Sequence, residues 1–373
     1  MENNIVLYRK YRPQDFSEII GQRHIVQTLQ NSLKSGATSH AYLFSGPRGS
    51  GKTTIARILA KALNCEKLSG SEPCNKCNSC QEIMAGKSLD LMEIDAASHT
   101  GVDDVRALIE GIKFGPVKSK YKIFIIDECH QLSKSAANAL LKTLEEPPSH
   151  AIFILATTEA HKMIPTIVSR CQRFDFKRLH TSEIVKKLEF ILKKEGIKYE
   201  PPVLSLIALN ARGSFRDAES LLDKCINFTA QDKVISLKEV KDLLGVVEVG
   251  QISKLFDLII SKNTKEAIVC LNSMIEEGID LQEFAKTLIF YLRECLLLKI
   301  NSNLVDSENT GFSNEEIEKM KSQVANLSEK EIHGMLELFI DAENKMKYAT
   351  ILQLPLELVI VDITHSEIQN IKH

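Results

Sequence analysis

Short apolar runs and helix-patterned segments alternate along the first half of the chain. Short, mainly apolar segments, which are typical of strands, occupy residues 41–45, 90–95, 121–128 and 151–156, although acidic residues interrupt the second and end the third. Apolar residues at helical spacing predict helices packed on a sheet at residues 23–34, 54–63, 104–112 and 134–144. Alternating strands and helices predict an α/β fold with a parallel, doubly wound sheet that extends to about Phe176.

The strand pattern stops at Thr181, and long amphipathic helices follow. They are predicted at residues 182–194, 202–225 with a break at Gly213, 253–260 and 281–300, with a polar loop at 301–314. We therefore expect an α/β domain over residues 1–178, a small helical domain over 179–245 and an all-helical domain over 246–373. The Leu-rich faces of the last helices are expected to form a core and a subunit interface.

Composition and charge limit the classes of protein to which the chain can belong. At 373 residues it is long enough for two or three independent cores. A net charge of −2 disfavours a free-standing nucleic-acid binder, which needs a basic excess to contact phosphates. The chain shows no signal-peptide pattern and no apolar run of the ~18 residues that a membrane span needs. We therefore expect a cytoplasmic protein without membrane contact.

Residues 46–53 match the phosphate-binding pattern G-x-x-x-x-G-K-[ST] at every fixed position. The segment reads Gly46-Pro47-Arg48-Gly49-Ser50-Gly51-Lys52-Thr53, and Thr54 follows it. Its glycines allow consecutive backbone N–H groups to surround a phosphate at the positive end of the helix dipole. Lys52 can then reach the β- and γ-phosphates, and the Thr53 hydroxyl can bind Mg²⁺. A glycine-rich turn that matches by accident is the alternative, which the flanking strand and helix disfavour.

Polar side chains end two further predicted strands. Asp127 and Glu128 end the strand over residues 121–128, at the edge of the sheet where α/β proteins bind ligands. Asp127 can hold magnesium and Glu128 can polarise an attacking water, although an acidic turn would give the same pattern. Thr157 and Thr158 end the next strand. A hydroxyl there could sense a γ-phosphate, but threonine is also common in strands for packing reasons.

Four of the nine cysteines lie close together in the sequence, at Cys65, Cys74, Cys77 and Cys80. Four thiolates in so short a segment suit a tetrahedral, structural Zn²⁺ site, which can fold a loop that has almost no core. An iron–sulfur cluster is the alternative. The bacterial ferredoxin pattern, however, requires cysteine and proline where Met84 and Ala85 stand. We therefore expect a zinc module over residues 65–80.

Two basic segments have uses that spacing alone does not decide. The lead Tyr8-Arg9-Lys10-Tyr11-Arg12-Pro13, in which Tyr11, Arg12 and Pro13 are the expected binding residues, could line an adenine pocket or form a surface arm. Arg170 follows a short predicted helix, at an edge from which its side chain is not expected to return to Lys52 of the same chain. Its guanidinium either suits the γ-phosphate of a neighbouring subunit or forms a structural ion pair with Asp175 or another carboxylate.

These motifs together resemble those of AAA+ ATPases, and more narrowly those of the gamma/tau subunit family of the bacterial DNA polymerase III clamp loader. The resemblance rests on residues 11–13, 46–54, the four cysteines, 93–98, 126–130, 140–148, 156–158, 169–171 and 213–217. For the rest of the chain, the resemblance is supported mainly by its length and its predicted helices. The zinc module inside the nucleotide domain is the discriminating feature.

The resemblance implies an ATP hydrolase that is part of a DNA-directed DNA polymerase holoenzyme. Such a subunit would form a five-membered ring with copies of itself and with delta-type and delta-prime-type subunits. The ring would use ATP and Mg²⁺ to open the sliding clamp and place it on primer–template DNA. Residues 179–245 would be the lid domain and 246–373 the collar domain. The longer tau form carries a C-terminal extension, so a chain ending at His373 is expected to hold the ring-forming part.

The resemblance also assigns roles to single residues. They are phosphate and magnesium binding for Lys52 and Thr53, metal and water binding for Asp127 and Glu128, the first and second sensors for Thr157 and Arg216, and a finger toward a neighbour's ATP for Arg170. Contacts with duplex phosphates are expected at helix starts near Thr100-Gly101 and Ser133-Lys134.

Two alternatives from neighbouring classes stay open. Another AAA+ motor, such as a branch-migration helicase, would share the phosphate loop and the carboxylates but not the four cysteines. The second alternative is a ring scaffold that does not hydrolyse ATP, of which the resemblance gives the delta-prime subunit as the example. Such a subunit would have the zinc module without a working phosphate loop. Lys52 and Glu128 are both present here, which disfavours the scaffold.

Overall fold

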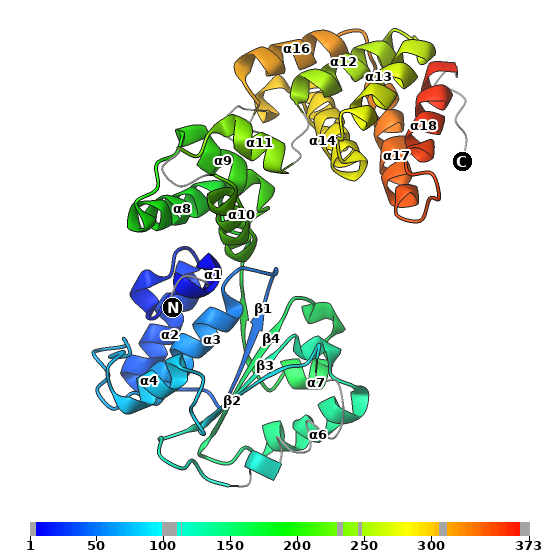
Figure 1. Ribbon diagram of the computed structural model, residues 1–373. Helices are drawn as coiled ribbons and strands as arrows, with labels where there is room; N and C mark the ends of the chain where they lie inside the picture. The colour runs from blue at the N-terminus through cyan, green and yellow to red at the C-terminus, as the bar shows by residue number, and fades with distance from the viewer. Residues whose placement is uncertain are drawn as a thin grey trace. The chain divides into compact units, whose positions relative to one another are not determined.

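The structure is a computed structural model, and it describes residues 5–98, 110–112, 114–229, 234–244, 248–305 and 312–365. The chain divides into two compact units between Asn227 and Phe228. The first unit contains a parallel sheet with helices around it, and the described part of the second is built from helices (Figure 1). The boundaries at 178/179 and 245/246 remain predictions from the sequence.

Five parallel strands form one sheet in the first unit, in the order β2-β3-β4-β1-β5. The strands are β1 Ala41–Ser45, β2 Leu91–Asp95, β3 Lys122–Asp127, β4 Ala151–Thr157 and β5 Gln172–Asp175. The register pairs Ser45 with Thr157 and Asp95 with Asp127, so the carboxyl ends of these strands meet at one edge. The chain crosses over at β1, and ligands of α/β proteins bind beside such a crossover. The predicted parallel, doubly wound sheet is confirmed.

Each face of the sheet has its own apolar core, because successive strand residues point to opposite faces. Tyr42 and Phe44 face α2 (Arg23–Ser35) and α3 (Lys52–Leu63). Leu43 and Phe153 face α6 (Lys134–Glu145) and α7 (Pro165–Val168), on the other side of the sheet (Figure 1). All four side chains are fully buried. Two covered faces explain why these strands read as unbroken apolar runs in the sequence.

Shorter elements and three longer helices complete this part of the chain. The short ones are α1 Leu7–Lys10, η1 Phe16–Glu18, α4 Asn78–Met84, η2 Cys129–Gln131 and η3 Ala160–Lys162, where η denotes a 3-10 helix. The longer ones are α8 Thr181–Glu195, α9 Pro201–Asn210 and α10 Phe215–Phe228. The predicted break at Gly213 separates α9 from α10. Most of the helix predicted over residues 104–112, and the helix start predicted at Thr100-Gly101, lie outside the described residues.

The helices described in the second unit are α11 Leu237–Leu244, α12 Val249–Ile260, α13 Thr264–Glu276, α14 Leu281–Ile300, η4 Ser302–Leu304, α16 Asn314–Val324, α17 Glu329–Met346 and α18 Leu354–His365. Those from α12 onward surround one core. Phe256, Phe284 and Phe339 lie fully buried in this core. Ser313 and Ser328 cap the starts of α16 and α17 through reciprocal bonds with glutamates three residues later. Among the described residues, no helix combines the length and apolarity needed to cross a membrane.

Candidate functional site

The phosphate-binding pattern forms a loop between β1 and α3, at the carboxyl edge of the sheet. Gly46, Gly49 and Gly51 have φ angles of 150°, 73° and 99°, which residues with side chains rarely adopt. Space requires glycine as well, because a Cβ on Gly46 would lie 2.5 Å from Phe176 O. A Cβ on Gly49 would lie 1.9 Å from Ser214 Oγ, just before α10. The loop is therefore held closely between the end of β5 and the start of α10.

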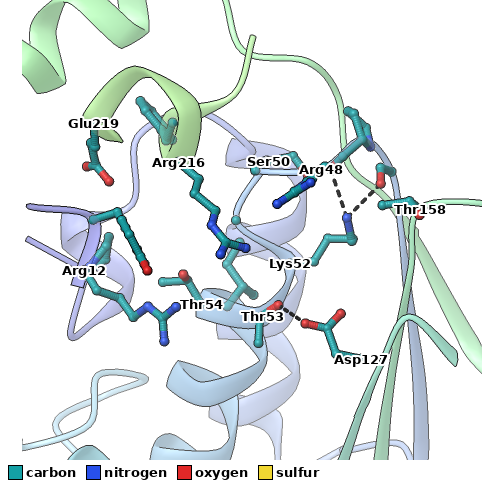
Figure 2. Close-up of a pocket in the computed structure, with 18 of the residues that line it drawn as sticks. Arg12, Arg48, Ser50, Lys52, Thr53, Thr54, Asp127, Thr158, Arg216 and Glu219 are labelled. Atoms are coloured by element: carbon teal, nitrogen blue, oxygen red, sulfur yellow. Dashed lines mark hydrogen bonds between the residues drawn. The ribbon is translucent and has the colours of Figure 1, made fainter. Parts of the chain in front are cut away.

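Lys52 and Thr53 begin α3 at the base of this loop. Lys52 is only 5% exposed, and its Nζ donates to the carbonyl oxygens of Gly46 and Pro47 at 2.8 and 2.9 Å. Burial lowers the pKa of Lys52, while Glu128 and Asp127 oppose that shift. Thr53 Oγ1 donates to Asp127 Oδ2 at 2.7 Å, as Figure 2 shows. One turn of α3 thus presents an ammonium group and a hydroxyl–carboxylate pair, which are the groups that phosphate and Mg²⁺ need.

Glu128 lies just beyond β3, in a left-handed conformation with φ 47° that is uncommon for a residue other than glycine. Its Oε2 accepts hydrogen bonds from the Thr158 N–H at 3.1 Å and from the Thr158 hydroxyl at 2.8 Å. Thr157 is fully buried, and its Oγ1 lies 2.9 Å from His130 Nδ1. The strand end therefore uses its two threonines differently, with Thr158 on Glu128 and Thr157 on a histidine that the sequence analysis did not single out.

A pocket of about 1050 Å³ opens above the loop. It is lined by residues 46–54, Asp127, Glu128 and Thr158, and by Arg12, Pro13 and Arg216 from outside the sheet. In Figure 2, Arg216 reaches down from α10 toward Thr54, while Arg12 approaches from the N-terminal lead. This volume and the mixture of polar and apolar walls suit a small-molecule ligand or cofactor.

The lead contributes a different tyrosine from the one expected. Tyr11 is absent from the pocket lining, because its hydroxyl donates to Glu195 of α8 at 2.5 Å and its ring packs edge-on against Phe190. Burial and this bond raise the pKa of Tyr11 to about 12. Tyr8, one helical turn earlier, lines the pocket, and the Arg216 guanidinium lies 5.2 Å from its ring centre. The lead therefore does line the pocket, a question that the sequence left open.

Two buried charged residues of the pocket wall were not predicted from the sequence. Lys187 on α8 donates to Tyr11 O at 2.8 Å, and Glu219 on α10 is buried close to it. Burial raises the pKa of Glu219 to about 7, although Lys187 and Arg12 act in the opposite direction. A signal existed, because each residue occupies a helical position that continues an apolar stripe.

Arg170 lies away from the pocket lining, after α7. Its Nη2 bonds Glu145 Oε1 at 2.6 Å, its Nη1 donates to Thr166 O at 2.8 Å, and 32% of its side chain is exposed. Asp175 pairs with Arg173 instead. An ion pair of the kind left open by the sequence therefore exists, with Glu145 as the partner, and Arg170 remains accessible at the surface.

The four clustered cysteines bring their sulfur atoms within 4.8 Å of one another. Tetrahedral zinc with Zn–S bonds of about 2.3 Å needs sulfurs a little under 4 Å apart, so the group fits such a site. The N–H groups of Cys74 and Cys77 donate to Cys65 Sγ and Cys74 Sγ, both at 3.3 Å. Bonds from the Lys76 and Cys77 backbone lower the pKa of Cys74 to about 6, which favours the thiolate that binds metal.

Comparisons with known proteins identify the family. Three family models match in chain order: DNA polymerase III, delta subunit, at residues 21–180; DNA polymerase III clamp loader subunit, ATPase lid domain, at 183–231; and DNA polymerase III subunits gamma and tau domain III, at 235–372. The DNA polymerase III subunit gamma of Buchnera aphidicola subsp. Acyrthosiphon pisum is 37% identical over 97% of this chain and 99% of its own length. The chain belongs to the gamma/tau family of DNA polymerase III subunits.

The gamma/tau family includes longer relatives. The DNA polymerase III tau subunits of Bacillus subtilis and Escherichia coli are each 42% identical, over 98% and 79% of this chain. The chain spans 64% and 46% of their lengths. Among solved structures, the Thermotoga maritima branch-migration motor RuvB covers 70% of this chain with 19% identity and a TM-score of 0.49, which is too low to carry an argument. The predicted membership of the gamma/tau family is confirmed.

Proposed function

We propose that this gamma/tau family member is the ATP-hydrolysing subunit of a sliding-clamp loader. It would form a ring with copies of itself and with delta-type and delta-prime-type subunits, open the sliding clamp and place it on primer–template DNA. The observation that carries the proposal is the 2.7 Å bond between Thr53 Oγ1 and Asp127 Oδ2, in a pocket that Lys52 and Glu128 also line. Family membership supports the assembly.

ATP and Mg²⁺ would be held by residues that already lie together. Thr53 and Asp127 offer two hard oxygen ligands, the kind that Mg²⁺ prefers. Lys52 and the backbone N–H groups at the start of α3 supply positive charge for the β- and γ-phosphates. When bound, Mg²⁺ would supply neutralisation of the phosphate charge that builds up during phosphoryl transfer.

Glu128 is proposed as the group that takes a proton from the attacking water. Two hydrogen bonds from Thr158 orient the Glu128 carboxylate. Nucleotide bound near the end of β4 could therefore change the orientation of Glu128 through Thr158. We assign the first-sensor role to the pair Thr157–Thr158 and the second-sensor role to Arg216, which lines the same pocket from α10.

Arg170 and the cysteine module complete the proposal. Arg170 is accessible and remote from its own pocket lining, which supports a role as a finger for the ATP of a neighbouring subunit. Cys65, Cys74, Cys77 and Cys80 would hold one structural Zn²⁺, because four protein ligands leave no open position for water.

The test is a clamp-loading assay that contains the chain, purified sliding clamp, the partner subunits and primed DNA. We expect the clamp to be loaded only when ATP is present, with ATP hydrolysis stimulated by clamp and DNA. Loading that is independent of ATP, or no measurable ATPase activity, would favour the silent scaffold. Branch migration by the chain without any clamp would favour the helicase alternative.

A further inference from the structure

The cysteine module does not simply cover the surface, because its polar side chains bond to the segment that walls the pocket. We call residues 8–20 the pocket arm, since Tyr8, Arg12, Pro13, Glu18, Ile19 and Ile20 of this segment line the pocket. The arm has little regular structure, only the short α1 and η1. Its position therefore depends on tertiary contacts.

Glu72 provides the most direct of these contacts. Its Oε2 accepts a hydrogen bond from the Phe16 N–H at 2.8 Å, in the middle of the arm. Its Oε1 accepts one from Gln30 Nε2 of α2 at 2.7 Å. Phe16 itself is buried in the core between the sheet and α2. A single carboxylate of the module thus ties the arm to the helix beneath it.

Lys61 makes a second link, from α3. This lysine is only 2% exposed, and its Nζ donates to Gln14 O at 2.5 Å and to Asn75 Oδ1 at 2.7 Å. Gln14 belongs to the arm, and Asn75 lies between two cysteines of the module. A buried ammonium needs such partners, because it is costly when left without hydrogen bonds. The arm, the module and the phosphate-binding helix therefore meet at one buried charge.

The loop that carries Glu72 and Asn75 depends on the cysteine cluster for its shape. Within residues 66–79 the buried positions are Ser71 and Pro73, so the loop has almost no apolar core of its own. Glu72 lies two residues before Cys74, and Asn75 directly follows it. A metal held by the four sulfurs would fix both side chains in place.

We propose that the zinc module is a metal-dependent support that holds the pocket arm in place, and that it sets the affinity of the pocket for nucleotide through Glu72. The inference rests on the proposed function of the pocket as a nucleotide site. Asp127 and Glu128 are positioned by β3 and by Thr158 rather than by the arm. Loss of this support should therefore raise the Kd for nucleotide. Turnover at saturating ATP should stay within about twofold of that of the unaltered chain.

The experiment measures the Kd of a fluorescent ATP analogue on the full chain, together with the zinc content and the thermal midpoint. Glu72→Ala should keep one zinc per chain and weaken binding about five- to thirtyfold, the range expected when a part-buried carboxylate with two hydrogen bonds is lost. Glu82→Gln is the matched control. Glu82 lies two residues after the module, on α4, and pairs with the exposed Lys118 at 3.1 Å rather than with the pocket arm. The control should bind nucleotide as the unaltered chain does.

Removal of zinc distinguishes support of the pocket arm from a role in stability alone. Chelation should raise the Kd of the unaltered chain by a similar or larger factor, restored by added Zn²⁺, and should change the Kd of Glu72→Ala less, because the Glu72 contact is already absent there and only the Asn75 link remains to be released. An unchanged Kd after chelation, or equal shifts in both proteins, would overturn the inference. A chain that binds no nucleotide even with zinc would instead overturn the proposed function.

Discussion

Lys52 and Glu128 line one pocket but differ in what their removal should change. Lys52→Ala removes the loop ammonium, so we expect hydrolysis to be lost and nucleotide binding to weaken while the fold survives. Glu128→Gln keeps the groups that bind phosphate and metal and removes the base. Binding should persist while turnover falls by about 10²- to 10⁴-fold. Equal loss of binding in the two variants, measured by nucleotide titration, would contradict the roles assigned to them.

Glu219 should make stability depend on pH. Burial raises its pKa to about 7, above the usual 4.5, even with Lys187 and Arg12 nearby. The fold therefore prefers the protonated acid, and this contribution is present below about pH 4.5 and lost as the pH rises through about 7. Because Gln mimics the neutral acid, Glu219→Gln should melt at a higher temperature than the unaltered chain at pH 8, and the gain should shrink toward pH 5.

Glu195 provides the opposite case for the same melting experiment. Bonds from Lys10 and Tyr11 lower the pKa of Glu195, so its contribution is present at neutral pH and lost as the solution becomes acidic. Glu195→Gln should therefore destabilise the chain at pH 8. For Glu219→Gln, a melting-temperature difference from the unaltered chain that does not change with pH would contradict the raised pKa of Glu219.

Arg170 distinguishes a finger from a surface ion pair. Its partner Glu145 is half exposed, and such pairs contribute about 0–1 kcal/mol, so Arg170→Ala should hardly change the melting temperature. The variant should bind ATP but hydrolyse it about 10³- to 10⁵-fold more slowly in the ring. Mixed with Lys52→Ala subunits, it should recover activity only where an intact finger faces an intact site. Lost thermal stability and no recovery on mixing would remove Arg170 from the catalytic residues.

At the scale of elements, the apolar pattern predicted four of the five strands and failed for β5 and for the lead. β1 and β4 were recognisable because both faces are covered, which leaves apolar runs such as residues 41–45. β5 exposes three of its four residues, so it gives no such run. The lead is different, because α1 spans only Leu7–Lys10 and gives no periodic signal. Whether Tyr8 or Tyr11 enters the pocket is decided by the Glu195 and Phe190 side chains of α8, far away in the sequence.

The cysteine module is an element whose folding should depend on the proposed metal. One Zn²⁺ per chain is expected from elemental analysis, with no visible absorption band of an iron–sulfur cluster. Cys80 is fully buried, so Cys80→Ser should lose the metal and lower the thermal midpoint. Purified, unaltered chain that contains no zinc and still melts in one cooperative transition would contradict the zinc assignment.

At the scale of the whole molecule, charge predicts how DNA is bound. With a net charge of −2 the isolated chain should bind DNA weakly, and the assembled ring with ATP should bind it far better. Ser133 caps α6, so the predicted phosphate contact at Ser133-Lys134 lies at a real helix start. Affinity should fall steeply as salt is raised in a titration. Tight, sequence-specific binding by the chain alone would contradict this view.

The strand order has a consequence for synthesis of the chain on the ribosome. β1 begins at Ala41, but its two neighbours are β4 and β5, which begin only at Ala151 and Gln172. At translation rates of about 5–20 residues per second, its apolar edges stay unpaired for roughly 5 to 20 seconds. During that interval the nascent chain exposes the strand that later carries the phosphate loop, and chaperones that bind extended apolar segments would find it there.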